Sequence, residues 1–317
     1  MQCERKMKLR SHNTSYCLIE VFTKACLTVI YNCVIFHIIC FSGSHNSYTY
    51  ELDVSSEIGP DKADIRPIIS MFGDTGKSVL KEWSVTQSLT FRQQLEHGVR
   101  YFDLRVATRK DKSGTHFLHS LYGMSVETGL NEIKSFMEQH PREIILLDFN
   151  HFYEMDAHNH EILIDLITEK FRAKLCPHLD MDSVTLEMMW ESGLQVIVLY
   201  QNQVVKDNMM FWPSVSIIAP WANTTGAHDL ITFLEQSYKA NRSPSQFHVV
   251  QGILTPGAGT IMAHLNSSLH NVFADKVAPR VVMWLKDKCA GLQGINICFI
   301  DFVEKADFIP TVLSLNK

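Results

Sequence analysis

Residues with apolar side chains gather in short runs along the chain. Segments 98–106, 143–148, 194–200 and 294–301 are each rich in apolar residues over most of their length. A strand that is apolar on both faces is typical of a parallel sheet with helices on either side. These four segments are therefore predicted to be buried parallel strands.

Between the predicted strands, apolar residues recur at helical spacing. Segment 126–137 has an apolar residue at every third or fourth position and is followed by Pro141, which ends a helix. Segment 163–171 repeats the pattern. A further helix is predicted over 79–97, with Gly98 as its terminating residue.

The alternation of strands and helices predicts the fold class. It runs from residue 43 to 317 without an obvious linker, which favours one α/β domain built as a (β/α) barrel over 43–317. A doubly wound open sheet is the alternative. No GxGxxG or GxxxxGK[ST] loop follows a predicted strand, so a nucleotide cofactor is not expected.

Composition narrows the class of function. The chain has 317 residues, 46% of them hydrophobic, which excludes disorder for most of its length. With 29 basic and 34 acidic residues it carries a net charge of −5, which argues against a nucleic-acid partner. Close-spaced CxxC pairs are absent, and the body of the chain is typical of a reduced, cytoplasmic protein. We expect a monomer.

The amino-terminal segment 1–42 has an atypical composition. Basic residues near the start precede an uncharged apolar run over 25–41, a pattern that resembles a signal peptide or anchor. Asn32 and His37 would be costly in hydrocarbon, and the run is short for a membrane span. Two interpretations stay open: membrane association through 17–42, or a buried helix or first strand that leads into the fold.

Polar side chains close several of the predicted strands, and in a barrel the chemistry lies at those carboxyl ends. His45 follows the apolar run that ends at Phe41. Asp103 and Arg105 lie two residues apart and therefore share one strand face. The alternatives are a loop histidine and a structural ion pair.

Three further segments add polar groups of the same kind. His119 follows the apolar pair Phe117 and Leu118, Asp148 begins the run 148–151, and Asp301 ends the strand 294–301. Helix or loop capping is the alternative for Asp148. Two imidazoles, a guanidinium and carboxylates at neighbouring strand ends favour phosphoryl transfer by general acid–base catalysis.

The motifs that contain these residues resemble those of the phosphatidylinositol-specific phospholipase C X-domain proteins, in particular the small eukaryotic group that carries the X domain alone. The matching segments are GSHNS at 43–47, KEWSVTQSLTFRQQL at 81–95, GVRYFDLRV at 98–106, LDFNHFY at 147–153, FWPS at 211–214, APWANTT at 219–225 and GINICFIDFVE at 294–304. The resemblance implies a distorted TIM barrel that cleaves phosphoinositide lipids at a membrane surface.

The resemblance also implies a role for each residue. His45 would be the general base on the inositol 2-hydroxyl, and His119 the general acid for the diacylglycerol oxygen. Arg105 would hold the phosphate beside Asp103, and Asp301 would orient His45. The products would be diacylglycerol and an inositol phosphate, as in lipid degradation linked to signal transduction.

Two positions bear on calcium. The large calcium-dependent phospholipases of this family carry acidic residues where this chain has Arg105 and Phe149. Because Ca²⁺ requires several oxygen ligands, the resemblance implies a metal-independent reaction without a cofactor.

The chain departs from the family pattern at Ser42, Ser120 and Asn46, and in its amino-terminal segment. Asn46 stands where close relatives have an aspartate that keeps the acid histidine protonated, and a neutral amide cannot stabilise an imidazolium by charge. A binding protein for phosphoinositides or inositol phosphates with little turnover is therefore the alternative function. A phosphodiesterase for soluble glycerophosphodiesters is a weaker third one.

Contacts to the headgroup and the membrane can also be assigned. Tyr200 at the end of the strand 194–200 could stack on the inositol ring, and Gln251 could bind ring hydroxyls; packing at the barrel end is the alternative for both. The apolar segment 209–213 is predicted either to form a membrane-touching rim or to belong to the core.

Overall fold

The computed structural model describes residues 36–62, 66, 69 and 72–317. Its sheet contains parallel strands in the spatial order β6, β5, β2, β1, β9, β8, β7. Their bounds are β1 (Phe41–Ser44), β2 (Tyr101–Arg109), β5 (Ile145–Tyr153), β6 (Val196–Tyr200), β7 (Ile217–Ile218), β8 (Phe247–Gln251) and β9 (Ile297–Ile300).

The barrel is distorted in two ways. The second half of β2 continues into an antiparallel extension of β3 (Lys112–His119) and β4 (Leu121–Ser125). Within the described residues, β6 and β7 do not pair with each other, and a single parallel bridge from Leu199 to Trp212 lies beside that opening. The single α/β domain is thus a distorted TIM barrel, as the alternating pattern and the family resemblance predicted.

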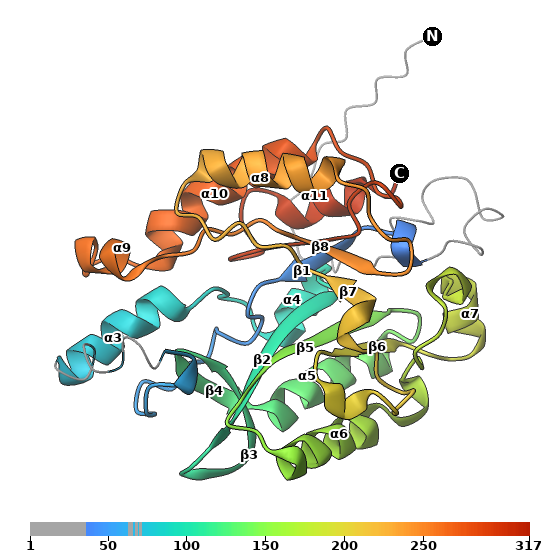
Figure 1. Ribbon diagram of the computed structural model, residues 1–317, viewed down its shortest axis with the longest axis horizontal. Coiled ribbons are helices and arrows are strands. Elements are labelled where there is room, and N and C mark those ends of the chain that lie inside the picture. Colours follow the sequence, from blue (N-terminus) through green and yellow to red (C-terminus); the bar gives the residue numbers. More distant parts are fainter. Residues whose placement is uncertain (1–35, 63–65, 67–68, 70–71) are drawn as a thin grey trace.

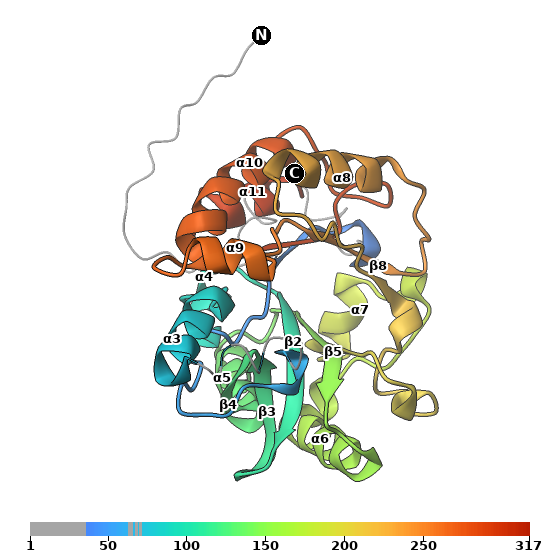
Figure 2. The ribbon, with the colours of Figure 1, turned by 60° about the vertical axis from the view of Figure 1, so that its left-hand side comes forward.

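Helices cover the outside of the barrel on two opposite flanks (Figure 1). On one side lie α8 (Ala227–Lys239), α10 (Asp275–Leu285) and α11 (Phe308–Ser314). On the other lie α5 (Val126–Gln139), α6 (Ala157–Phe171) and α7 (Leu186–Glu191). Near one end of the barrel α3 (Gly73–Ser84) and α9 (Ala258–Ala263) lie beside each other in both views (Figures 1 and 2).

The four strands and two of the helices predicted from the apolar pattern are confirmed as β2, β5, β6, β9, α5 and α6. The single helix predicted over 79–97 is wrong. The chain forms α3, then an extended stretch from Val85, then α4 (Phe91–His97), which Thr90 caps with its hydroxyl. The helix breaks because Thr86 and Gln87 bond to the backbone around His45 instead of continuing the turn. Gly98 ends α4 in the left-handed conformation, as predicted.

The start of the chain enters the fold before the predicted domain boundary. The backbone N–H of Phe36 donates to Val184, and that of Cys40 donates to the Asn316 side chain. The first strand begins at Phe41, so the division expected between residues 42 and 43 falls inside β1. The interpretation of 17–42 as an anchor rests mainly on positions that lie outside the described residues. In the described part of the chain, no helix has both the length and the apolar content needed to cross a membrane.

Candidate active site

A cavity of about 640 Å³ lies at the carboxyl ends of the parallel strands and extends between α3 and α9. Polar side chains from several strands line it, and apolar side chains of α3, α9 and the neighbouring loops line the rest. Most residues assigned to the site from the sequence are among them: His45, Asp103, Arg105, His119 and Gln251.

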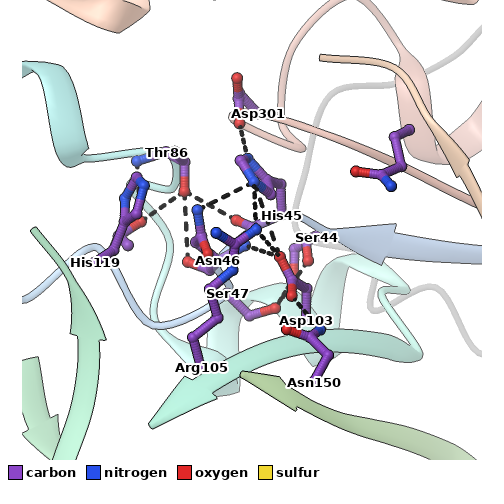
Figure 3. A network of polar contacts seen from close by, with 12 residues as sticks. Ser44, His45, Asn46, Ser47, Thr86, Asp103, Arg105, His119, Asn150 and Asp301 are labelled. Carbon is purple, nitrogen blue, oxygen red and sulfur yellow. Dashed lines mark hydrogen bonds and ion pairs between the residues drawn. The ribbon is translucent and has the colours of Figure 1, made fainter. Parts of the chain in front are cut away.

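His45 and Asp301 form a buried dyad at the ends of β1 and β9. His45 Nδ1 lies 2.7 Å from Asp301 Oδ1, and Arg105 Nη2 lies 3.3 Å from His45 Nε2 (Figure 3). Asp301 as a carboxylate only accepts and the guanidinium only donates, so the proton of a neutral His45 belongs on Nδ1. The lone pair on Nε2 is then available to take a proton from a ligand.

The parallel register of the sheet explains why these residues meet. Ser44 pairs with Phe102 on β2 and with Ile300 on β9. The residues that follow these three are His45, Asp103 and Asp301, respectively, and they therefore come together. Strand β1 packs so closely that a Cβ on Gly43 would lie 2.8 Å from a ring carbon of Tyr101. This position therefore accepts glycine far more readily than any other residue.

Gln87 fixes the same two strand ends from the break between α3 and α4. Its amide nitrogen donates to the carbonyls of His45 (3.1 Å) and Ile300 (3.0 Å), and its oxygen accepts from Val303 N (3.2 Å). Gln87 was not predicted as a site residue, because the apolar pattern over 79–97 indicates a continuous helix there. A polar Thr-Gln pair within an otherwise amphipathic segment was the available signal.

Asp103 is buried and fully bonded. Its carboxylate accepts from Asn46 N (2.8 Å) and from the Asn150 amide (2.6 Å), and Arg105 Nη2 lies 3.7 Å away. Burial alone would raise the pKa of Asp103, but Arg105, His45 and these hydrogen bonds outweigh it and hold the pKa below its ordinary value. The carboxylate is therefore ionised and keeps the guanidinium in place.

His119 enters the cavity from the end of β3. Its Nδ1 lies 2.8 Å from the carbonyl of Ser84, and its ring centroid is 6.3 Å from that of His45. Figure 3 shows the guanidinium of Arg105 between the two imidazoles. Burial, followed by the charges of Arg105 and Lys62, places the pKa of His119 well below its ordinary value. His119 is therefore neutral at pH 7 in this structure.

The side chain of Asn46 lies against His45. Its side-chain nitrogen lies 3.1 Å from His45 Nε2, and Tyr48 Oη donates to its oxygen at 3.4 Å. The backbone of Asn46 has a φ of 40°, which turns the chain sharply after β1 and directs the side chain toward His45.

The assignment of Tyr200 as a headgroup contact is also wrong. Its side chain is buried outside the cavity, with its hydroxyl 2.6 Å from His160 Nδ1. In the sheet Tyr200 pairs with Phe149 on the outer face, so packing at the barrel end, the alternative interpretation, describes it. The next residue, Gln201, faces the cavity instead.

The two remaining polar residues of this side are Gln251 and Asp148. Gln251 lines the cavity as predicted and donates to the carbonyl of Ala219 at 2.8 Å. Asp148 accepts from Tyr101 Oη at 2.6 Å and from the Gln201 amide at 2.8 Å. Burial raises the pKa of Asp148 to about 6, although both hydrogen bonds favour the carboxylate.

The segment 209–213 belongs mainly to the core. Phe211 and Trp212 are buried, and Met209 alone of its large apolar residues is strongly exposed. Exposed apolar side chains instead lie near the cavity at Trp221, which lines it, and at Met262 on α9.

The donors in the cavity are a poor match for a calcium ion. No group of three or more His, Cys, Asp or Glu side chains is arranged to hold a metal within the described ranges. The carboxylate of Asp103 faces the Arg105 guanidinium at 3.7 Å, so an added cation there would meet a fixed positive charge. Phe149 is buried on the outer face of β5. These residues do not fit a calcium site.

Fold and site together define a class. The barrel is similar to that of the phosphatidylinositol-specific phospholipase C from Listeria monocytogenes, with a TM-score of 0.59, 16% identity and coverage of 92% of this chain and 97% of that one. A variant of the Staphylococcus aureus phosphatidylinositol-specific phospholipase C superposes with a TM-score of 0.64 at 15% identity, over 90% and 95% of the two chains. The molecule thus has the fold of the bacterial enzymes of that name.

Sequence relatives identify the family within this class. The chain is 43% identical over 276 residues to mouse PI-PLC X domain-containing protein 2, covering 86% of this chain and 81% of the relative. Identity to human PI-PLC X domain-containing protein 3 is 37% over 277 residues, covering 86% of each. No family model matches. The protein belongs to the family of PI-PLC X domain-containing proteins.

Proposed function

We propose that the protein is a phosphoric diester hydrolase that cleaves phosphatidylinositol-type lipids to diacylglycerol and inositol phosphate. The observation that carries the proposal is the His45–Asp301 dyad at 2.7 Å, which presents Nε2 to Arg105 in a cavity shared with His119. Such a set provides a base, an anion-binding cation and a second imidazole within the span of one phosphodiester.

The reaction begins at His45. Its Nε2 takes the proton of an inositol hydroxyl, and the hydroxyl oxygen attacks the phosphorus atom. Asp301 stabilises the imidazolium that results, since its carboxylate lies on the opposite ring nitrogen. Arg105, released from Nε2 when the phosphate enters, binds the phosphoryl oxygens.

His119 completes the transfer. The bond from phosphorus to the glycerol oxygen breaks, and the proton on His119 Nε2 passes to that oxygen, which leaves a cyclic inositol phosphate. Water can open the cycle by the reverse sequence of proton transfers. A bound phosphodiester anion offsets the positive charge of Arg105 and so raises the low pKa of His119 toward a useful value.

A lipid leaving group is supported by the apolar side of the cavity. Leu80 and Trp83 lie near the end of α3, within about one helical turn of Ser84, whose carbonyl binds His119. Leu254, Ile261 and Leu269 line the same cavity. An apolar wall next to the proton donor favours diacylglycerol over the alcohol of a soluble glycerophosphodiester.

The protein acts as a calcium-independent, cytoplasmic monomer in lipid degradation and signal transduction, and contacts the membrane transiently with exposed residues such as Trp221. Arg105, a permanent cation at the phosphate position, supports the independence from calcium.

The test uses purified protein with vesicles that contain radiolabelled phosphatidylinositol, with and without excess chelator. We expect labelled inositol phosphate to be released equally in both conditions, and the rate to fall at least about a hundredfold in His45→Ala. His158→Ala, an exposed site on α6, is the matched control and should retain full activity. Activity that is abolished by chelator and restored by Ca²⁺ would contradict the proposal.

A second candidate is a binding protein for the same headgroup with little turnover. The Nδ1 of His119 contacts a backbone carbonyl rather than a carboxylate, so no fixed negative charge there favours its protonated form. This function predicts that vesicles containing phosphatidylinositol are bound but release no product from the parent protein.

A further inference from the structure

The two sides of the cavity differ in charge, and this difference affects which lipid headgroup can bind. If the proposed function holds, the inositol ring carries the hydroxyl attacked by way of His45, whereas His119 protonates the glycerol oxygen. The ring therefore lies on the far side of the phosphate from His119 and the apolar residues of α3. This side is lined by Tyr101, Asp148, Asn150, Gln201 and Gln251.

These side chains are held in fixed positions. Tyr101 and Gln201 donate to the two oxygens of Asp148, at 2.6 and 2.8 Å. The Asn150 amide lies 2.6 Å from Asp103 and 3.3 Å from Asp148 and so joins the two carboxylates. A carboxylate with a free lone pair and neighbouring amides is a good partner for ring hydroxyls, which can both donate and accept.

Among the described residues, the same side offers no lysine or arginine for a ring phosphate. In the described part of the chain, the lysine and arginine side chains that line the cavity are Arg105 and Lys62. Arg105 is already assigned to the phosphodiester. Lys62 acts on the other side, where its charge lowers the pKa of His119. Asp103 is ionised at neutral pH because its pKa is lowered. Asp148, with a pKa of about 6, is ionised in most molecules at that pH.

We infer that the substrate is phosphatidylinositol with an unphosphorylated ring, and that Asp148 determines this specificity by accepting hydroxyl hydrogen bonds and repelling ring phosphates. A phosphate on the ring would have to enter beside the buried carboxylate of Asp148, whose hydrogen-bond donors are all neutral, while Arg105, the cation beside Asp103, is occupied by the phosphodiester.

The experiment compares three vesicle preparations in excess chelator, containing phosphatidylinositol, its 4-phosphate or its 4,5-bisphosphate, with total anionic charge matched by phosphatidylserine. We expect phosphatidylinositol to be cleaved at least about tenfold faster than either phosphorylated lipid. In Asp148→Asn that ratio should fall several-fold. Asp207→Asn, which removes one charge at a fully exposed site, controls for attraction to the vesicle and should leave the ratio unchanged. Cleavage of the bisphosphate as fast as phosphatidylinositol overturns the inference while the proposed function stands.

A binding measurement separates the two claims. If no lipid is cleaved, the proposed function fails, and calorimetry with soluble headgroups decides the inference. Tighter binding of inositol 1-phosphate than of inositol 1,4,5-trisphosphate by the parent protein supports it. Equal or tighter binding of the trisphosphate, or no binding of either, overturns it. Because this comparison uses the unaltered chain, it does not depend on whether Asp148→Asn folds.

Discussion

The pKa of a buried residue in this barrel depends on whether its neighbours are charged. Asp103 on β2 and Asp148 on β5 are both buried and pair in the sheet, yet Asp103 has an arginine and a histidine nearby while Asp148 has neutral donors. Their pKa values therefore move in opposite directions, down for Asp103 and up to about 6 for Asp148. One carboxylate anchors a cation, and the other carries a charge that burial disfavours.

Asp148 makes stability depend on pH. Because its pKa is raised on folding, the protonated form is favoured in the folded state, and the contribution present at low pH is lost as pH rises through about 6. Asp148→Asn cannot titrate. The free energy of unfolding of the parent protein minus that of the variant should increase by about 1 kcal/mol from pH 7 to pH 5. Urea unfolding at the two pH values measures it, and a difference that stays constant or decreases would contradict the raised pKa.

The identities of the site residues were largely predictable from the sequence. The directions in which their side chains point were harder to predict. His45, Asp103, Arg105, His119 and Asp301 follow or end apolar runs, and this pattern brought them together correctly. Tyr200 was misassigned because side chains alternate along a strand, and a shift of one residue exchanges the outer face for the cavity. Tyr200 and Gln201 could not be distinguished from the sequence alone, because the choice depends on the pairing of Phe149 with Tyr200 in the sheet.

At the scale of elements, the break between α3 and α4 connects the helical layer to the site. The segment 79–97 has a helical apolar pattern, which led to the prediction of one helix. Tertiary contacts override that pattern, since Thr86 and Gln87 have buried partners at the ends of β1 and β9. The antiparallel pair β3 and β4 was also not predicted, because β3 begins with the exposed, polar residues 112–114.

Gln87→Ala tests this connection. The change leaves the carbonyls of His45 and Ile300 without the amide donor they share, so the free energy of unfolding should fall by about 1–3 kcal/mol. Cleavage of phosphatidylinositol should fall with a lower kcat and little change in KM, since the dyad loses its alignment and the cavity wall remains. Urea unfolding and vesicle kinetics measure the two effects.

Gln236→Ala, on the exposed face of α8, is the matched control. An unchanged kcat in Gln87→Ala, together with the loss of stability, would mean that Gln87 supports the fold and does not position the dyad.

At the scale of the whole molecule, the barrel brings together residues that are far apart in sequence. His45 and Asp301 are separated by 256 positions, and the adjacent parallel strands β1 and β9 place them 2.7 Å apart. The alternation of strands and helices predicted the barrel, but it could not predict the opening between β6 and β7, which depends on where the short strand β7 ends. The cavity lies at the mouth of this barrel, with apolar walls on the side of His119 and carboxylates on the side of Asp148.

The division of labour between the two imidazoles is tested most directly by changing the leaving group. The measurement compares vesicle phosphatidylinositol with a soluble aryl ester of myo-inositol 1-phosphate, whose phenolate departs without a proton. His119→Ala should lose at least about a hundredfold on the lipid but less than about tenfold on the aryl ester, and His45→Ala should lose activity on both. Equal losses on the two substrates in His119→Ala, or full activity of His45→Ala on either, would contradict acid–base catalysis by this pair.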